Sequence, residues 1–215
     1  MVQMSPSVSS GMSLGAPQAS RIFEAISEFL IRRRILLSAI MFILLVAEDV
    51  MFGTKPHDLF DFRDPMTVTG LLLVVSGLAI RSWAVGILRK DAELTMTGPY
   101  RLIRNPLYVG SFLMMFGFCA LIGDRENIFF VLGPVLLIYV VKVRHEEQLL
   151  STRFAAQWSD YARTTPRFFP RLFPSFQKTS QPANWRLAQW LHSREYQAVG
   201  ATLAALVAIK VWQSA

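Results

Sequence analysis

MTVTGLLLVVSGLAIRSWAVGIL, residues Met66 to Leu88, is the stretch of sequence that decides the fold. It is long enough to cross a bilayer, because a helical crossing needs about 20 mostly apolar residues. Arg81 is its one charged residue, and it lies roughly 10 Å from the C-terminal end at about 1.5 Å per residue. An arginine at that depth is costly unless it is paired, faces a polar cavity or snorkels to the interface. The stretch therefore predicts a transmembrane helix with one residue whose environment needs an explanation.

Four further apolar segments extend this pattern. They are Ile35–Phe52, Leu107–Gly123, Asn127–Val141 and Tyr196–Trp212. Composition agrees with a membrane protein, because 53% of the 215 residues are hydrophobic and only 17% are charged, against about 25% charged in ordinary globular proteins. We therefore expect an all-α, polytopic helical membrane protein with about five transmembrane helices.

The flanking regions have different compositions. Residues 1–20 are uncharged and rich in Ser, Gly, Met and Pro, which predicts a disordered tail. Residues 21–34 contain an amphipathic run closed by three arginines, which predicts an interfacial helix with a basic anchor. Residues 35–170 form the expected membrane core, and residues 171–215 add a loop and the fifth crossing. The one cysteine, Cys119, lies in an apolar run and is expected to be a packing residue.

The basic residues indicate the orientation of the chain. The formal net charge is +7, and the Lys and Arg residues lie between the apolar runs. Anionic lipid headgroups therefore explain them better than nucleic acid does. With five crossings, 17 basic residues fall on one side of the membrane and 4 on the other. This split predicts a multi-pass protein of the inner or cytoplasmic membrane with a cytoplasmic N-terminus.

The first candidate motif is GPYRLIRNPLYVG, Gly98 to Gly110. Gly98-Pro99 is a turn signal, and Asn105-Pro106 is typical of a helix start with Asn105 as the N-cap. A helix N-terminus has free N–H groups and a positive dipole end, which suit an anionic group. The simpler interpretation is an ordinary cap flanked by two interfacial arginines, Arg101 and Arg104.

The second candidate motif is RHEEQ, Arg144 to Gln148, where the fourth crossing leaves the membrane. Adjacent residues of a helix point about 100° apart, so at most one of Glu146 and Glu147 faces a given pocket squarely. The simpler interpretation is a solvated acidic pair. Downstream, Leu150, Phe154, Trp158 and Tyr161 share one helical face, which predicts an interfacial helix. No metal site is expected, because the spacing of the histidines is not that of metal ligands.

The two motifs together resemble the isoprenylcysteine carboxyl methyltransferase family, which is related to the phospholipid methyltransferases, and the chain looks like a bacterial-type member. The first motif resembles the signature GPYRxxRHPxYxG, with Asn105 where the signature has histidine. The second, with Arg167-Phe168-Phe169-Pro170, resembles the EExxL…RFxP segment of that family. The resemblance implies a helical membrane enzyme that binds S-adenosylmethionine in a cytoplasmic pocket. Carried over by position, the cofactor-binding candidates are Tyr100, Arg104, Asn105, Tyr108, Glu146 and Glu147.

The expected reaction is methyl transfer to a lipophilic small molecule or lipid that enters from the membrane. A carboxylate acceptor needs no general base, and Arg81 or Arg167 would orient it. An amine or thiol acceptor must lose a proton, and His145 or a carboxylate is then the candidate base. Two alternatives stay open: an NADPH-dependent lipid or sterol-type reductase, and a non-catalytic membrane protein that keeps the fold, consistent with Asn105.

Overall fold

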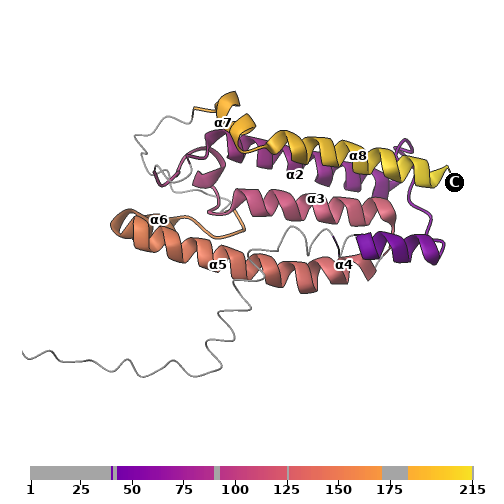
Figure 1. Ribbon diagram of the computed structural model, residues 1–215, viewed down its shortest axis with the longest axis horizontal. Helices are drawn as coiled ribbons and strands as arrows, with labels where there is room; N and C mark the ends of the chain where they lie inside the picture. The colour runs from indigo at the N-terminus through magenta and orange to yellow at the C-terminus, as the bar shows by residue number, and fades with distance from the viewer. Residues whose placement is uncertain (1–39, 41–42, 90–92, 125, 171–183, 215) are drawn as a thin grey trace, which may run out of the picture.

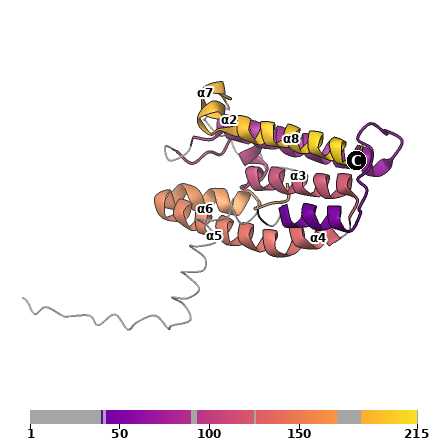
Figure 2. The same cartoon turned by 45° about the vertical axis from the view of Figure 1, so that its right-hand side comes forward.

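The computed structural model describes residues 40, 43–89, 93–124, 126–170 and 184–214. Within those residues the regular structure is helical, with no β-strand. The helices form an elongated bundle in which α8 lies along α2, and α3 lies between α2 and the long α4–α5 helix (Figures 1 and 2). The predicted all-α class is confirmed. The expected tail at residues 1–20 and the expected interfacial helix at residues 21–34 lie outside the described residues.

Helix α2 (Pro65–Ile87) matches the predicted crossing at Met66–Leu88 to within one residue at each end. The side chain of Asp64 caps it by accepting a hydrogen bond from the Met66 N–H at 3.0 Å, and proline takes the first helical position. Its 23 residues span roughly 34 Å at about 1.5 Å per residue, which exceeds the apolar thickness of a bilayer of about 30 Å.

Helix α3 (Pro106–Ile122) begins one residue before the predicted crossing at Leu107–Gly123. It ends at Gly123, whose φ of 84° is left-handed and favours glycine. Helix α4 (Glu126–Phe130) follows within a few residues, so the two helices form the expected hairpin. Contacts from the start of α3 to the end of α5 show that the two arms are antiparallel.

The second arm of the hairpin is longer than the predicted fourth crossing at Asn127–Val141. Helix α4 passes through a π-helical turn, η2 (Val131–Val135), into α5 (Leu136–Arg153), which makes one continuous helix. Pro134 explains the π turn, because proline has no N–H to donate and clashes with the preceding turn of an α-helix. The interfacial helix predicted through Tyr161 is divided at Phe154, whose φ of −123° ends α5 before α6 (Ala155–Thr164) begins.

Four glycines hold α2 and α3 in close contact: Gly70, Gly77, Gly110 and Gly117. A Cβ atom placed on Gly77 would lie 2.5 Å from the backbone oxygen of Gly110, and one on Gly117 would lie 2.7 Å from that of Gly70. Both distances are shorter than van der Waals contact, and the clashing atoms belong to a backbone that cannot rotate away. Small residues let membrane helices pack this closely.

The α2–α3 contact gives a first prediction. Replacing Gly77 by valine is expected to destabilise the protein by about 3 kcal/mol or more, because overpacking against a fixed backbone forces the helices apart. Gly200 on α8 is a matched control, since a Cβ atom placed there would have no other atom within 4 Å. Thermal unfolding in lipid nanodiscs should separate the two valine variants. Equal unfolding midpoints of the two variants would contradict this account of the α2–α3 contact.

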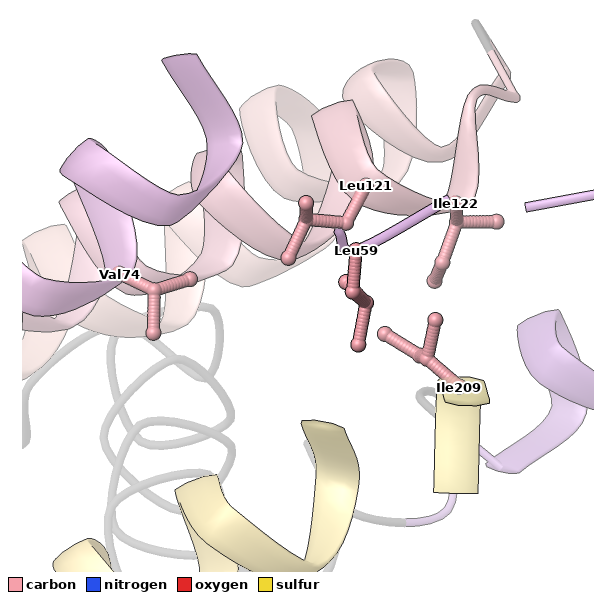
Figure 3. Packing of buried hydrophobic residues seen from close by; sticks show 5 residues of the cluster. All are labelled: Leu59, Val74, Leu121, Ile122 and Ile209. Atoms are coloured by element: carbon pink, nitrogen blue, oxygen red, sulfur yellow. The ribbon is translucent and has the colours of Figure 1, made fainter. Parts of the chain in front are cut away.

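The C-terminal region contributes α7 (Leu187–His192) and α8 (Glu195–Gln213). Helix α8 corresponds to the predicted fifth crossing at Tyr196–Trp212. Near its C-terminal end, Ile209 packs against a buried cluster that joins α2, α3 and the loop before α2 (Figure 3). The cluster contains Leu59, Val74, Leu121, Ile122 and Ile209.

Two of the described helices are long and apolar enough to cross a membrane: α2 and the continuous helix Glu126–Arg153. Helix α3 is apolar but shorter. Large apolar side chains are exposed on α2, on α5 and on α8, among them Leu72, Val75, Leu137, Leu203 and Val207. These features fit a membrane protein with two or more apolar helices, while the count of five crossings stays a prediction.

Candidate functional site

The two sequence motifs meet at one end of the bundle. The turn of the first motif is a single 3-10 turn, η1 (Gly98–Arg101), which begins at Gly98 with a left-handed φ of 58°. The Tyr161 hydroxyl donates to the Tyr100 carbonyl at 2.7 Å, and the Arg104 N–H donates to the Pro166 carbonyl at 2.8 Å. These bonds fasten the first motif to α6 and to the residues that follow it.

Glu147 is the centre of this junction. It lies on α5 and is only 7% exposed. Its carboxylate accepts from Asn105 Nδ2 at 3.0 Å and from Arg104 Nη1 at 3.3 Å. It also accepts from Arg167, through Nε at 3.1 Å and Nη2 at 2.6 Å. We call Arg104, Asn105, Glu147 and Arg167 the Glu147 cluster.

The Glu147 cluster changes the interpretation of the helix start. Asn105 does hold the N-cap position of α3, but its side chain does not cap the helix. The amide donates instead to Glu147 and, at 3.4 Å, to the Arg167 carbonyl. A buried carboxylate must be paired and hydrogen-bonded, so it takes this donor. The anionic group expected near the start of α3 is therefore supplied within the chain, by Glu147.

The role of Asn105 leads to a second prediction. Both of its bonds are donated from Nδ2 to oxygen acceptors, and a histidine ring N–H provides the same kind of donor. We expect Asn105→His to keep the protein stable within about 1 kcal/mol, whereas Asn105→Leu leaves a buried carboxylate short of a donor and costs about 1–3 kcal/mol. Thermal unfolding of the two variants is the measurement. A histidine variant as unstable as the leucine variant would show that the position does not act as a donor.

Burial keeps the two tyrosines of the junction protonated. It raises the pKa of both the Tyr100 and the Tyr161 phenol well above the usual value. Tyr161 can therefore serve as a permanent donor to the Tyr100 carbonyl. The Tyr100 hydroxyl is itself buried and has no hydrogen-bond partner among the described residues.

Glu146 faces a different environment from its neighbour, as adjacent helical positions require. Its carboxylate accepts a hydrogen bond from the Tyr108 hydroxyl at 2.8 Å and pairs with Lys142 at 3.1 Å. Tyr108 meets the Tyr139 ring edge-on at 5.3 Å, and Phe112 packs against the same ring at 5.2 Å. A half-exposed carboxylate thus lies beside an aromatic wall formed by these three rings.

An open pocket of about 390 Å³ adjoins the Glu147 cluster. Its volume is within the range of small-molecule sites, which is about 300–1,000 Å³. Trp158 on α6 forms an aromatic side of the pocket, and the Arg104 guanidinium lies 5.7 Å from its ring centre. The residues that line the pocket are Arg144, Glu147, Gln148, Ser151, Trp158 and Arg167.

Four of those lining residues were absent from the sequence-based candidates: Arg144, Gln148, Ser151 and Trp158. A signal for three of them was present, because Arg144, Gln148 and Ser151 recur at spacings of four and three and so form one polar helical face. Trp158 instead shared the apolar face that the sequence assigned to the interface. Its position at the pocket depends on the break at Phe154.

Arg81 and His145 lie apart from the Glu147 cluster. Arg81 forms a bidentate ion pair with Glu195, through bonds of 2.9 and 3.0 Å, and donates to the Ser111 hydroxyl at 2.5 Å. Glu195, only 4% exposed, is the first residue of α8. Arg81 is therefore paired rather than snorkelling, and its partner was missed. His145 is exposed. Of the three catalytic candidates, only Arg167 joins the cluster.

The described residues contain no group of three or more His, Cys, Asp or Glu side chains placed to hold a metal ion. The polar groups at the motif end of the bundle are instead arginines, amides, hydroxyls and two glutamates. They suit an organic ligand that carries both a positive and a negative charge.

Comparisons with known proteins agree with the motif resemblance at a coarser level. Residues 65–157, which span α2 to α6, match the phospholipid methyltransferase family. The chain is 31% identical to the cobalt-zinc-cadmium resistance protein CzcN of Cupriavidus metallidurans, over 74% of each chain. It is 37% identical to the nickel-cobalt-cadmium resistance protein NccN of Alcaligenes xylosoxydans xylosoxydans, over 51% of this chain and about half, 54%, of that relative. No solved structure matches. The chain is therefore a relative of CzcN that belongs to the phospholipid methyltransferase family.

Proposed function

We propose that this protein is a membrane methyltransferase that uses S-adenosylmethionine to methylate a lipophilic acceptor. Membership of a methyltransferase family supports the reaction class. The finer assignment, an isoprenylcysteine carboxyl methyltransferase-like member, rests on the two motifs and on their spatial junction. The proposal also retains the cytoplasmic placement of those motifs that the charge distribution favours.

The observation that carries the proposal is that two consecutive glutamates, Glu146 and Glu147, have different surroundings. Glu147 is neutralised by two arginines within the Glu147 cluster, whereas Glu146 is half-exposed beside aromatic rings. A carboxylate next to aromatic faces favours a cation such as a sulfonium. Arg144 and Arg167, which line the pocket, favour a carboxylate. S-adenosylmethionine carries both groups, so the residues present fit this cofactor.

Individual roles follow from these positions. Glu146 and Tyr108 are the candidates for the sulfonium side, and Arg144 and Arg167 at the pocket for the amino-acid carboxylate. Trp158 offers a flat surface on which the adenine can stack. The Glu147 cluster holds the elements that carry these side chains in register.

When bound, S-adenosylmethionine would supply a methyl group carried on positively charged sulfur. The protein mainly aligns the acceptor with that methyl and excludes water. A carboxylate acceptor forms its new bond without losing a proton. An amine or thiol acceptor must give up a proton, and Glu146 with Tyr108 is better placed to receive it than exposed His145.

Binding of the cofactor tests the proposal directly. Purified protein in nanodiscs should gain about 2.7 kcal/mol of stability when S-adenosylmethionine is present at 100 times its dissociation constant. We expect Glu146→Gln to abolish that gain and Glu126→Gln, an exposed carboxylate at the other end of the bundle, to keep it. Stabilisation by NADPH instead would favour the reductase alternative. No stabilisation by either ligand would favour the non-catalytic one.

The names of CzcN and NccN add a physiological expectation. We propose that methylation by this protein contributes to resistance to divalent metal ions. Cells that express the wild-type chain should then grow at higher cobalt, zinc or cadmium concentrations than cells that express Glu146→Gln. Equal growth of the two strains would contradict the role in metal resistance and leave the methyltransferase proposal unaffected.

A further inference from the structure

A second polar cluster lies at the end of the bundle opposite the Glu147 cluster. Asp49 lies near the end of the helical segment 43–51, and Asn127 lies in the first turn of α4. The Asn127 amide donates to Asp49 Oδ2 at 2.8 Å, which joins these two segments (Figure 1). Asp49 is 1% exposed and Asn127 is 3% exposed. Both side chains are thus removed from water.

Two oxygen atoms of this pair have unmet hydrogen-bonding capacity. Asp49 Oδ1 and Asn127 Oδ1 are buried, and neither has a hydrogen-bond partner among the described residues. More than nine in ten buried polar groups have a hydrogen-bond partner. Two unpartnered oxygens on side chains that contact each other therefore require an explanation. The Asn127 oxygen is an acceptor only, and so is the Asp49 oxygen while its carboxyl is ionised. The missing group must therefore be a donor or a cation.

Two further oxygen-bearing side chains lie near Asp49. The Asp124 carboxyl and the Thr54 hydroxyl both influence its carboxyl group electrostatically. One Asp124 oxygen already accepts from the Glu126 N–H at 2.9 Å. Two neighbouring carboxylates repel each other unless a proton or a cation lies between them. We call Asp49, Thr54, Asp124 and Asn127 the Asp49 site.

We propose that the Asp49 site binds one divalent cation of the hard, oxygen-preferring type, such as Ca²⁺, Mg²⁺ or Mn²⁺. Carboxylate, amide carbonyl and hydroxyl oxygens are the ligands that these ions prefer. A proton shared by the two carboxyl groups would satisfy Asp49 Oδ1 and leave Asn127 Oδ1 without a partner. A cation can engage both. The bound ion would fasten segment 43–51 to the turn between α3 and α4, far from the methyl-transfer site.

The test of this proposal is the binding of Mn²⁺ alone. Electron paramagnetic resonance measures it as loss of the free-ion signal. The full chain in nanodiscs, stripped with a chelator, should bind one Mn²⁺ and show a higher unfolding midpoint. We expect Asp49→Asn and Asp124→Asn each to weaken binding at least tenfold. Asp124 is partly exposed and asparagine can keep the bond to the Glu126 N–H, so this variant should fold. Asp61→Asn, an exposed carboxylate in the neighbouring loop, should bind as the wild type does.

Three outcomes would overturn the cation site. The first is the absence of bound Mn²⁺, with Mg²⁺ and Ca²⁺ also failing to shift the unfolding midpoint. The second is undiminished binding by the Asp49→Asn and Asp124→Asn variants. The third is Mn²⁺ binding that weakens as much in the Asp61→Asn variant as in the Asp49→Asn variant, because that result places the ion outside the Asp49 site.

Discussion

Glu147→Gln is expected to destabilise the protein by about 3–5 kcal/mol, because the largely buried Arg104 would lose its ion-pair partner and keep an uncompensated charge. Arg104 and Arg167 both depend on this carboxylate, and Asn105 donates to it as well. Methyl transfer should fall by about 100-fold or more, since even a 1 Å displacement of positioning groups costs about that much.

Glu146→Gln is the matched control for this prediction. The same substitution one residue earlier removes a half-exposed charge that bonds to Tyr108 and Lys142. Such a loss should change the unfolding free energy by less than about 1 kcal/mol. Thermal unfolding of the two variants in nanodiscs is the measurement. If Glu147→Gln proved as stable as Glu146→Gln, Glu147 would not be the group that joins the two motifs.

The second large effect concerns the ion pair between α2 and α8. Arg81→Leu and Glu195→Gln should each destabilise the protein by about 3–5 kcal/mol, because each leaves an unpaired charge in a buried setting. The double variant Arg81→Leu/Glu195→Leu should recover most of that loss, since replacing a whole buried pair by apolar residues is often neutral.

The same variants distinguish a structural Arg81 from a catalytic one. If Arg81 serves only to hold α8 against α2, the double variant should bind S-adenosylmethionine and transfer methyl groups within about threefold of the wild type. A double variant that is stable but transfers methyl groups at least 100-fold more slowly would show that Arg81 acts on the substrate. Unfolding midpoints and turnover should therefore be measured on one preparation of each variant.

Sequence patterns predicted the helices better than the contacts between them. The apolar runs Met66–Leu88 and Leu107–Gly123 matched helices to within one residue at each end, because capping and stop residues lie where the apolar runs end. The sequence predicted a crossing at Asn127–Val141 that continues as an interfacial helix through Tyr161, whereas the continuous helix ends at Arg153 and a break at Phe154 separates it from α6. Capping residues indicate where helices begin and end, whereas hydrophobicity indicates only which segments lie in lipid.

The site was predicted in part for a similar reason. The motifs identified Glu147, Asn105, Arg104 and Arg167 as candidates, but not that all four belong to one buried cluster. The partner of Arg81 lies 114 positions away in the sequence, and no local pattern connects residues at that separation. An arginine in an apolar run requires a partner, yet only the packing of α8 against α2 identifies it as Glu195.

The most direct test of the central claim is the transfer of a labelled methyl group from S-adenosylmethionine to a lipid extract. Membranes that contain the wild-type chain should label a lipophilic product, and membranes with equal amounts of folded Glu146→Gln protein should label at least 100-fold less. Wild-type and Glu146→Gln membranes that label lipid equally, or not at all across varied extracts, would contradict the assignment as a methyltransferase.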